Sequence, residues 1–386
     1  MCRPHPMACS RQQPEEHRLS GNSNIIVLAA GGTGGHLFPA QALAEELVRR
    51  GYVIHLMTDE RVRDYGKGFP AAETHVVPSA TLSLSDPLHL PGRLLRLYAG
   101  YRQARAILKR LGAGAVVGFG GYPSFPPILA AARLGIPSCV HDQNAVMGRA
   151  NRVLSRYATT VASSFPSLLG LPAAARDKLV VTGNPVRDIA LKERGADYPD
   201  MSGRFNLLVF GGSQGARFFA EFMPPVLQAM SAEARSRLRL VQQCRPEDLD
   251  AVKAAYAKLG FDFELQPFFM DMPKRIAASH LVVCRSGAST IAELGVIGRP
   301  AIMVPLPHAL DNDQLRNAES FASAGAGWVR PQAALEASEF AAFLTRLAGD
   351  EATLKKAAAA ALGHGRPDAA QRLADLTEHL AGNTTT

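Results

Sequence analysis

The chain has 386 residues, of which 47% are hydrophobic and 20% charged, a composition typical of a globular protein with two or three domains. No stretch approaches 18 consecutive apolar residues, which argues against a transmembrane helix. The cysteines are odd in number and scattered, at Cys2, Cys9, Cys139, Cys244 and Cys284. Without a C-x-x-C pair they argue against a disulfide framework or a structural zinc site, and we expect a reducing, cytoplasmic compartment.

The net charge of +8 is unevenly distributed along the chain. Between residues 87 and 176, eleven Lys and Arg residues are opposed by Asp142 alone, so this window carries +10 and the remainder is slightly acidic. Such clustering predicts a basic surface on one domain that faces phosphate groups.

The first half of the chain alternates between predicted strands and helices. Residues 1–22 are polar and lack an apolar core segment, so we interpret them as a disordered extension, not a signal peptide. A buried strand at 24–30 leads into a helix at 36–50 whose apolar residues recur at helical spacing. Further strands are predicted at 53–57, near 75–77, and at 113–117, 138–141, 160–163 and 179–182.

The pattern restarts after a charged stretch, 187–204, that we interpret as an interdomain linker. A strand at 206–210 and a helix at 216–230 are followed by strands near 238–242, 263–266, 281–284 and 301–304, and by helices over 334–363 and 366–381. The alternation predicts an α/β protein with two Rossmann-like, doubly wound parallel-sheet domains facing a cleft. We expect these domains at 23–186 and 205–365, with a C-terminal helix and tail at 366–386 that returns to the first domain.

Two glycine-rich turns occupy equivalent places in the two halves. Gly31-Gly32-Thr33-Gly34-Gly35-His36 follows the first strand, and Gly211-Gly212-Ser213-Gln214-Gly215-Ala216 follows the strand at 206–210. A tight turn between a strand and a helix directs backbone N–H groups at an anion. The first turn could instead belong to a dinucleotide fingerprint, but that pattern needs glycine where Leu37 stands. A purely structural turn is the other alternative.

His36 opens the helix at the carboxyl edge of the sheet, where ligands of such folds bind. A helix N-terminus disfavours the imidazolium form, so a neutral His36 could act as a base. A capping or packing histidine is the alternative.

The segment from Cys284 to Glu293 also runs from a strand into a helix. Glu293 either closes a capping box with Thr290 or accepts the hydroxyls of a ribose. Asp311-Asn312-Asp313 has the form of a D-x-D metal motif but lies in a loop rich in Pro and His, where a solvated loop is the simpler interpretation.

Seven segments together resemble one family. They are GGTGGHLFPA (31–40), GFGGYPSFP (118–126), HDQNAVMGRANR (141–152), GNPVR (183–187), GGSQGAR (211–217), VCRSGASTIAEL (283–294) and VPLPHALDNDQLRNA (304–318). From about residue 24 to 380 the chain resembles the MurG family of bacterial UDP-N-acetylglucosamine transferases, part of glycosyltransferase family 28. The one departure is Asp142, where the family usually has glutamate.

The resemblance implies a GT-B fold and inverting transfer of GlcNAc from UDP-GlcNAc to the C4 hydroxyl of MurNAc in lipid I, giving lipid II. It implies His36 as the catalytic base and no cofactor or obligatory metal. The residues it implies for UDP-GlcNAc binding are Thr33, Gly34, Gly35, Asn144, Arg187, Ser213, Phe269, Ala288, Ser289, Thr290, Ile291, Ala292, Glu293 and Gln314.

The basic window acquires a role from this resemblance. Apolar and basic residues mix around 88–110, and the membrane-facing candidates are Arg93, Leu94, Leu95, Arg96, Leu97 and Arg102. We expect an interfacial helix on anionic lipid at the cytoplasmic face of the bacterial inner membrane. A helix packed on its own sheet is the alternative.

Other cell-wall synthesis proteins are further candidate partners, and nucleic acid is a weaker one because no binding motif is present. A transferase with a soluble acceptor, a UDP-GlcNAc epimerase of similar architecture and an inactive nucleotide-binding scaffold remain the competing functions.

Overall fold

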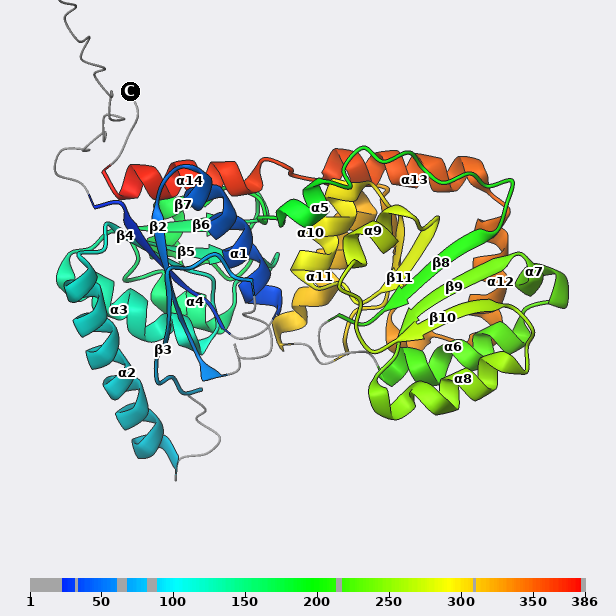
Figure 1. The fold of residues 1–386 in the computed structure, drawn as a ribbon, viewed down its shortest axis with the longest axis horizontal. Coiled ribbons are helices and arrows are strands. Elements are labelled where there is room, and N and C mark those ends of the chain that lie inside the picture. Colours follow the sequence, from blue (N-terminus) through cyan, green and yellow to red (C-terminus); the bar gives the residue numbers. More distant parts are fainter. Residues whose placement is uncertain are drawn as a thin grey trace, which may run out of the picture.

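The computed structural model describes residues 23–31, 34–60, 68–81, 89–212, 217–307 and 310–382. These residues form two lobes, each built on a single parallel sheet, lying side by side (Figure 1). The predicted α/β class with two Rossmann-like domains is therefore confirmed.

The first lobe contains a seven-stranded sheet in the order β3-β2-β1-β4-β5-β6-β7. Its strands are β1 (Ile25–Ala29), β2 (Val53–Thr58), β3 (Glu73–Val76), β4 (Ala115–Gly118), β5 (Ser138–Asp142), β6 (Thr160–Ser163) and β7 (Leu179–Val181). Successive side chains of a strand point to opposite faces, so Leu28 and Val27 enter different apolar clusters. Helices α1 (Gly34–Arg49) and α14 (Ala369–Leu380) cover one face, and α2 (Leu90–Leu111), α3 (Phe125–Leu134) and α4 (Arg149–Leu154) cover the other.

The second lobe contains a six-stranded sheet in the order β10-β9-β8-β11-β12-β13. Its strands are β8 (Phe205–Phe210), β9 (Leu238–Gln243), β10 (Asp262–Gln266), β11 (Leu281–Cys284), β12 (Ala301–Met303) and β13 (Gly327–Val329). Helices α6 (Arg217–Ala229), α8 (Leu249–Ala257) and α12 (Ala337–Ala348) pack on one face, with the short α7 (Ala232–Ser236) at its margin. The other face carries α5 (Asp188–Leu191), α9 (Met272–Ala277), α10 (Ala288–Ile297) and α11 (Asp313–Ser323), and α13 (Glu351–His364) packs against α10.

The chain passes between the lobes twice. After β7 it enters α5, and the stretch expected to be a linker is attached to the second lobe, where Arg299 donates to the carbonyls of Ala196 and Asp197. At the other end, α14 lies over the first lobe (red in Figure 1) and contributes Leu373 and Ala374 to its core. This return places both chain crossings on the same side of the site described below.

Helix α2 is anchored by only half of its length. Its buried residues all lie toward its C-terminal end, at Gly100, Ala104, Ile107 and Leu108. Gly100 is required by a close approach, since a Cβ there would lie 1.9 Å from the carbonyl oxygen of Pro78. The N-terminal half projects beyond the sheet (Figure 1) and exposes Leu94 and Leu95. The C-terminal half of α2 is therefore packed on its own sheet, and for the exposed N-terminal half the membrane-facing interpretation stays a prediction.

Some predicted boundaries were wrong. The helices expected over 334–363 are α12, which ends at Ala348, and α13, which begins after Asp350 accepts a hydrogen bond from the N–H of Thr353. The helix expected from 36 begins at Gly34. Across the described residues, no helix combines the length and apolarity needed to span a bilayer.

Candidate functional site

His36 lies in the first turn of α1, directly after the carboxyl end of β1. Its ring packs against a second glycine turn, Gly120-Gly121, in which both residues have positive φ angles of 95° and 70°. A Cβ at either glycine would lie 3.4 Å from an atom of the His36 ring. The glycines after β4 therefore provide the backbone shape and the space that bring the imidazole to the edge of the sheet.

A chain of hydrogen bonds runs from His36 into the core of the first lobe. His36 Nδ1 lies 3.1 Å from Oε1 of Gln143. Nε2 of Gln143 lies 3.0 Å from Nδ1 of His141, and Nε2 of His141 lies 2.9 Å from the carbonyl oxygen of Gly183. The chain thus ends on a backbone carbonyl, which can only accept.

That carbonyl fixes the direction of every bond in the chain. Burial lowers the pKa of His141 to about 4, so this ring is neutral, donates to Gly183 through Nε2 and accepts at Nδ1. Gln143 must then donate its NH₂ to His141 and present its oxygen to His36. His36 consequently carries its proton on Nδ1, and its lone pair is on Nε2, the arrangement that a general base needs.

Asp142, between these two residues, organises the loop that follows β5. Its carboxylate accepts hydrogen bonds from the N–H groups of Asn144 and Gly148 and from Nδ2 of Asn151. The side chain is fully buried, and burial raises its pKa to about 6. Aspartate, with a shorter chain than the family's usual glutamate, supports the loop and does not enter the cleft.

Asn144 lies where the two lobes meet. Its Oδ1 accepts from Nδ2 of Asn317 on α11, and Oδ1 of Asn317 accepts from the N–H of Ala145, both at 2.9 Å. Nδ2 of Asn317 also donates to the carbonyl of Ser286, just before α10. These bonds connect the loop after β5 to the donor-side helices, so Asn144 is engaged in an interlobe contact in this structure.

Arg187, which directly precedes α5, connects Glu293 of the second lobe to Phe38 on α1 of the first lobe. Nη2 of Arg187 lies 2.9 Å from Oε1 of Glu293, and the guanidinium carbon lies 3.8 Å from the ring centroid of Phe38 on α1. Helix α10 is capped by Gly287, which places Thr290 inside the helix. The capping-box interpretation of Glu293 is therefore wrong, because Thr290 is not an N-cap residue.

The remaining donor-side candidates are arranged around the first turns of α10. Ala288, Ser289, Thr290 and Ala292 are partly exposed, whereas Ile291 is buried in the core and could reach a ligand only through its backbone. The ring of Phe269 is buried beneath the guanidinium of Arg275, which likewise leaves its backbone as the accessible part. The sequence predicted these positions without distinguishing side-chain from backbone contact.

Gln314 and the acidic loop at 311–313 lie at the N-terminal end of α11. Oε1 of Gln314 accepts from the N–H of Leu306, which leaves its NH₂ for a ligand. Asp311 pairs with Arg149 across the lobes at 3.4 Å, and Asp313 accepts from the N–H of Gln314. Asp311 thus has a partner in the first lobe, and Asp313 has one in its own helix.

Both glycine turns lie partly outside the described residues. Thr33 and Ser213 are among those not described, so the structure does not place them. Gly34 is buried at the start of α1, and Gly35 is exposed with open space around its Cα.

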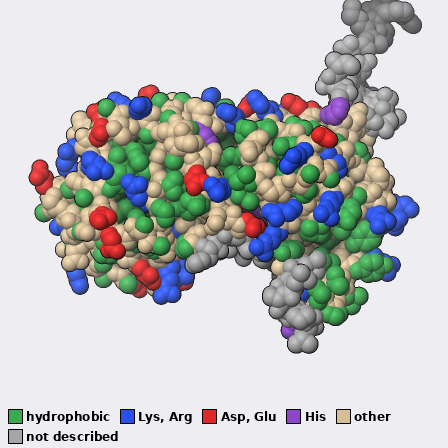
Figure 2. Space-filling model, turned by 180° about the vertical axis from the view of Figure 1, so that it is seen from behind, with side chains coloured by type: hydrophobic (Ala, Val, Ile, Leu, Met, Phe, Trp, Pro, Cys, Tyr) green, Lys and Arg blue, Asp and Glu red, His purple; other side chains and the backbone are tan. Residues whose placement is uncertain are grey.

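A cavity of about 1220 Å³ opens between α2 and the segments that follow β2 and β3. Arg93 and Arg96 line it from α2, Glu60 lines it opposite Arg96 at 4.0 Å, and Tyr122 lines it next to the glycine turn behind His36. Apolar side chains gather at the end of the molecule from which α2 projects, with Lys and Arg among them (lower right of Figure 2). Of the predicted membrane-facing residues, Leu94 and Leu95 are 50% and 70% exposed. Leu97 is less exposed and half-buried.

Sequence analysis missed His141 and Gln143 as partners of His36. The sequence did hold a signal, because Gln143 follows His141 by two residues at the end of a strand. Residues two apart in a strand have side chains on the same face of the sheet, where they can form a hydrogen bond. Phe38, which stacks on Arg187, carried no comparable signal.

Two Rossmann-like lobes that meet around Phe38, Asn144 and Arg187 define the GT-B fold, which nucleotide-sugar glycosyltransferases share with other enzymes. Models of the glycosyltransferase family 28 N-terminal and C-terminal domains match residues 26–163 and 206–373. The chain belongs to this family.

Its similarity to individual members extends along the whole fold. It is 49% identical over 366 residues to the UDP-N-acetylglucosamine–N-acetylmuramyl-(pentapeptide) pyrophosphoryl-undecaprenol N-acetylglucosamine transferase of Rhizobium johnstonii, covering 94% of this chain and 97% of the relative. The protein of the same name from Sinorhizobium fredii is 50% identical with the same coverage.

Among solved structures, MurG of Acinetobacter baumannii superposes with a TM-score of 0.73 at 30% identity, covering 92% of this chain and 99% of that one. A putative UDP-N-acetylglucosamine 2-epimerase from Listeria monocytogenes shares the fold alone, with a TM-score of 0.66 at 14% identity.

Proposed function

We propose that this protein transfers GlcNAc from UDP-GlcNAc to the C4 hydroxyl of MurNAc in lipid I, forming the β-1,4 linkage of lipid II. Identity of about half to relatives that carry this name supports the substrates. In the reaction, the acceptor oxygen forms a bond to the anomeric carbon, the bond from that carbon to UDP breaks with its electron pair on the phosphate, and the hydroxyl proton goes to the enzyme. Attack from the face opposite UDP inverts the anomeric centre.

His36 receives that proton at Nε2. The observation that carries this role is the chain from His36 through Gln143 and His141 to the Gly183 carbonyl, because it leaves the lone pair on Nε2. Removing the imidazole should lower kcat by roughly 10²- to 10⁴-fold, the range typical of a general base.

The donor is bound by the second lobe. Glu293 accepts the ribose hydroxyls through Oε2, since Arg187 already holds Oε1. The turn at 211–215, the N-terminus of α10 and Arg187 meet the negative charge that develops on departing UDP. Gln314 donates its NH₂ to a GlcNAc hydroxyl, and the backbones of Phe269 and residues 288–292 contact uracil and the nucleotide.

Lipid I approaches along the first lobe. The exposed leucines of α2 insert into the interface while its arginines meet anionic headgroups, which holds the protein at the cytoplasmic face of the inner membrane. The cavity beside α2 reaches Tyr122, next to the turn behind His36, and provides a route for the acceptor from the lipid surface to the base. The glycine turn at 31–36 then faces the diphosphate of lipid I, and the product serves wall growth, cell shape and division.

Transfer of radiolabelled GlcNAc from UDP-GlcNAc to a lipid I analogue in detergent tests this proposal. We expect labelled lipid II and one UDP per transfer, with little product from a water-soluble sugar acceptor. Equal turnover with the soluble acceptor, or conversion of UDP-GlcNAc to its C2 epimer without any acceptor, would replace the proposed reaction with one of its two enzymatic rivals.

A further inference from the structure

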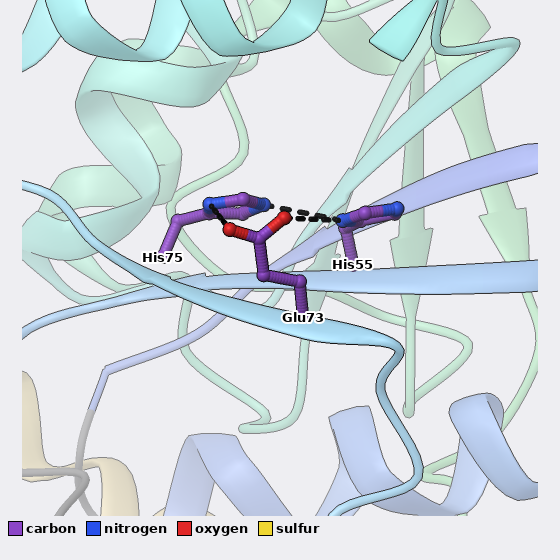
Figure 3. A group of neighbouring side chains, drawn as sticks. All are labelled: His55, Glu73 and His75. Atoms are coloured by element: carbon purple, nitrogen blue, oxygen red, sulfur yellow. Dashed lines mark hydrogen bonds and ion pairs between the residues drawn. The ribbon is translucent and has the colours of Figure 1, made fainter.

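Two histidines and a glutamate meet at the outer edge of the first sheet, away from the cleft. His55 lies on β2, and Glu73 and His75 lie on the edge strand β3. The parallel register pairs His55 with Glu73 and Met57 with His75, so all three side chains project from the same face (Figure 3). Among the described residues, they form the group of His, Cys, Asp and Glu whose ligand atoms lie close enough together to hold one metal ion.

The two imidazoles face each other through nitrogen atoms. Nδ1 of His55 lies 3.1 Å from Nε2 of His75. The ring planes differ by 10° and the ring centroids are 5.4 Å apart, so the rings lie edge to edge and not one over the other (Figure 3). Both nitrogens are thus directed into one small volume between the strands.

The carboxylate of Glu73 closes the third side of that volume. Oε2 lies 3.9 Å from Nδ1 of His55, and Oε1 lies 3.4 Å from Nδ1 of His75. Both histidines are 7% exposed, whereas the side chain of Glu73 is 54% exposed and can adjust. Among the described residues, Arg110 of α2 adds a cation beside this group, with its Nη2 3.9 Å from Oε2 of Glu73.

We propose that His55, Glu73 and His75 form a binding site for a divalent cation of the Zn²⁺ type. Zinc–nitrogen bonds are about 2.0–2.1 Å long, so two nitrogens 3.1 Å apart subtend about 100° at a shared ion, close to the tetrahedral angle. The ion lies off the line between the nitrogens, on the side of Glu73, and each ring must turn until its lone pair points roughly 40° away from that line. A water molecule takes the fourth position.

The donor set selects the class of cation. Two imidazoles with one carboxylate suit zinc and its neighbours among the late first-row metals, whereas Mg²⁺ and Ca²⁺ require oxygen ligands. The apolar cluster behind the pair, which includes Met57 and Val77, restricts water on the inner side. The ion therefore cross-links the edge strand β3 to β2 through residues that have no part in the proposed transfer. Cysteine spacing, on which the sequence-based expectation of no zinc site rested, could not reveal a site built from register.

Zinc binding to the full-length, tag-free protein tests this site. After treatment with a chelator, the wild type and the double variant Glu73→Gln/His75→Gln are dialysed against Zn²⁺, and bound metal is counted by mass spectrometry. The wild type should hold one equivalent of zinc more than the double variant. Zinc bound by other histidines and cysteines is the same in both proteins and cancels in this comparison. Zinc at 100-fold over the dissociation constant should raise the Tm of the wild type by on the order of 5 °C and leave that of the double variant unchanged.

Three single variants separate ligation from other effects. Glu73→Gln changes an exposed side chain and should fold normally while weakening zinc binding by roughly tenfold or more. Arg110→Gln removes a cation that competes for Glu73 and should tighten zinc binding. His379→Gln changes an exposed histidine on α14 and should leave zinc binding unchanged. Equal zinc content and equal Tm shifts in the wild type and the double variant would overturn the proposal and leave a metal-free imidazole pair.

Discussion

Replacing Gln143 by leucine removes the residue that fixes the proton on Nδ1 of His36. The bond between them spans 3.1 Å, and a neutral hydrogen bond contributes about 1–1.4 kcal/mol. Losing that preference lets the inactive tautomer, with its proton on Nε2, become populated. A preference of about 1.4 kcal/mol corresponds to a tautomer ratio of about ten, so its loss lowers the fraction of His36 with the proton on Nδ1 from about nine-tenths to about one-half when the tautomers are otherwise equal. We therefore expect Gln143→Leu to lower kcat about twofold and to leave KM for UDP-GlcNAc nearly unchanged.

The variant also affects folding, so it needs a matched control. Leucine leaves the buried Nδ1 of His141 without a donor, which costs about 1–3 kcal/mol of unfolding free energy. Gln242 is a buried glutamine in the second lobe whose Oε1 accepts from the hydroxyl of Tyr256. Gln242→Leu should lose similar stability by denaturant titration and keep its kcat.

Steady-state transfer to a lipid I analogue, with donor and acceptor varied separately, supplies both constants. A kcat for Gln143→Leu equal to that of the wild type would refute the fixed-tautomer argument. So would an equal fall in kcat for Gln242→Leu, because lost stability alone would then explain the effect.

Three further predictions concern the donor site, the membrane surface and the base of α2. Glu293→Gln should weaken UDP-GlcNAc binding by roughly 10- to 100-fold, the loss of hydrogen bonds to a charged group, and unchanged affinity by calorimetry would remove Glu293 from the ribose. Leu95→Glu should lower binding to anionic vesicles in a sedimentation assay, whereas Leu362→Glu, at an exposed leucine on α13, should not. Gly100→Ala should destabilise the protein by at least about 2 kcal/mol because its Cβ meets a backbone carbonyl, while Gly92→Ala on the same helix meets open space and should be neutral; equal Tm values for the two would contradict the packing.

The architecture could be predicted because the hydrophobic pattern is local. The runs 25–30 and 207–210 are apolar throughout, as expected of strands buried on both faces, and each is followed by glycines and a helix. Helix ends were less predictable, since the start of α1 at Gly34 depends on how its first turn packs against Phe38.

The site was predictable only in part, because its decisive contacts join distant residues. His36 could be singled out from its place after a strand, but its tautomer depends on Gln143 and on a carbonyl at Gly183. The pairing of Arg187 with Glu293 likewise joins distant residues, and the stacking of Arg187 on Phe38 requires the relative placement of two lobes, which no local pattern encodes. The zinc-type site depends on strand register, which a single sequence does not determine.

Analysis of the product formed with lipid I tests the central claim most directly. After incubation with UDP-GlcNAc, the disaccharide released from the lipid should show by NMR a β-configured GlcNAc attached to C4 of MurNAc, and an equal amount of UDP should appear. His36→Ala should form the same product at least 100-fold more slowly. An α-linked product, attachment at another hydroxyl, or undiminished turnover by His36→Ala would contradict the account.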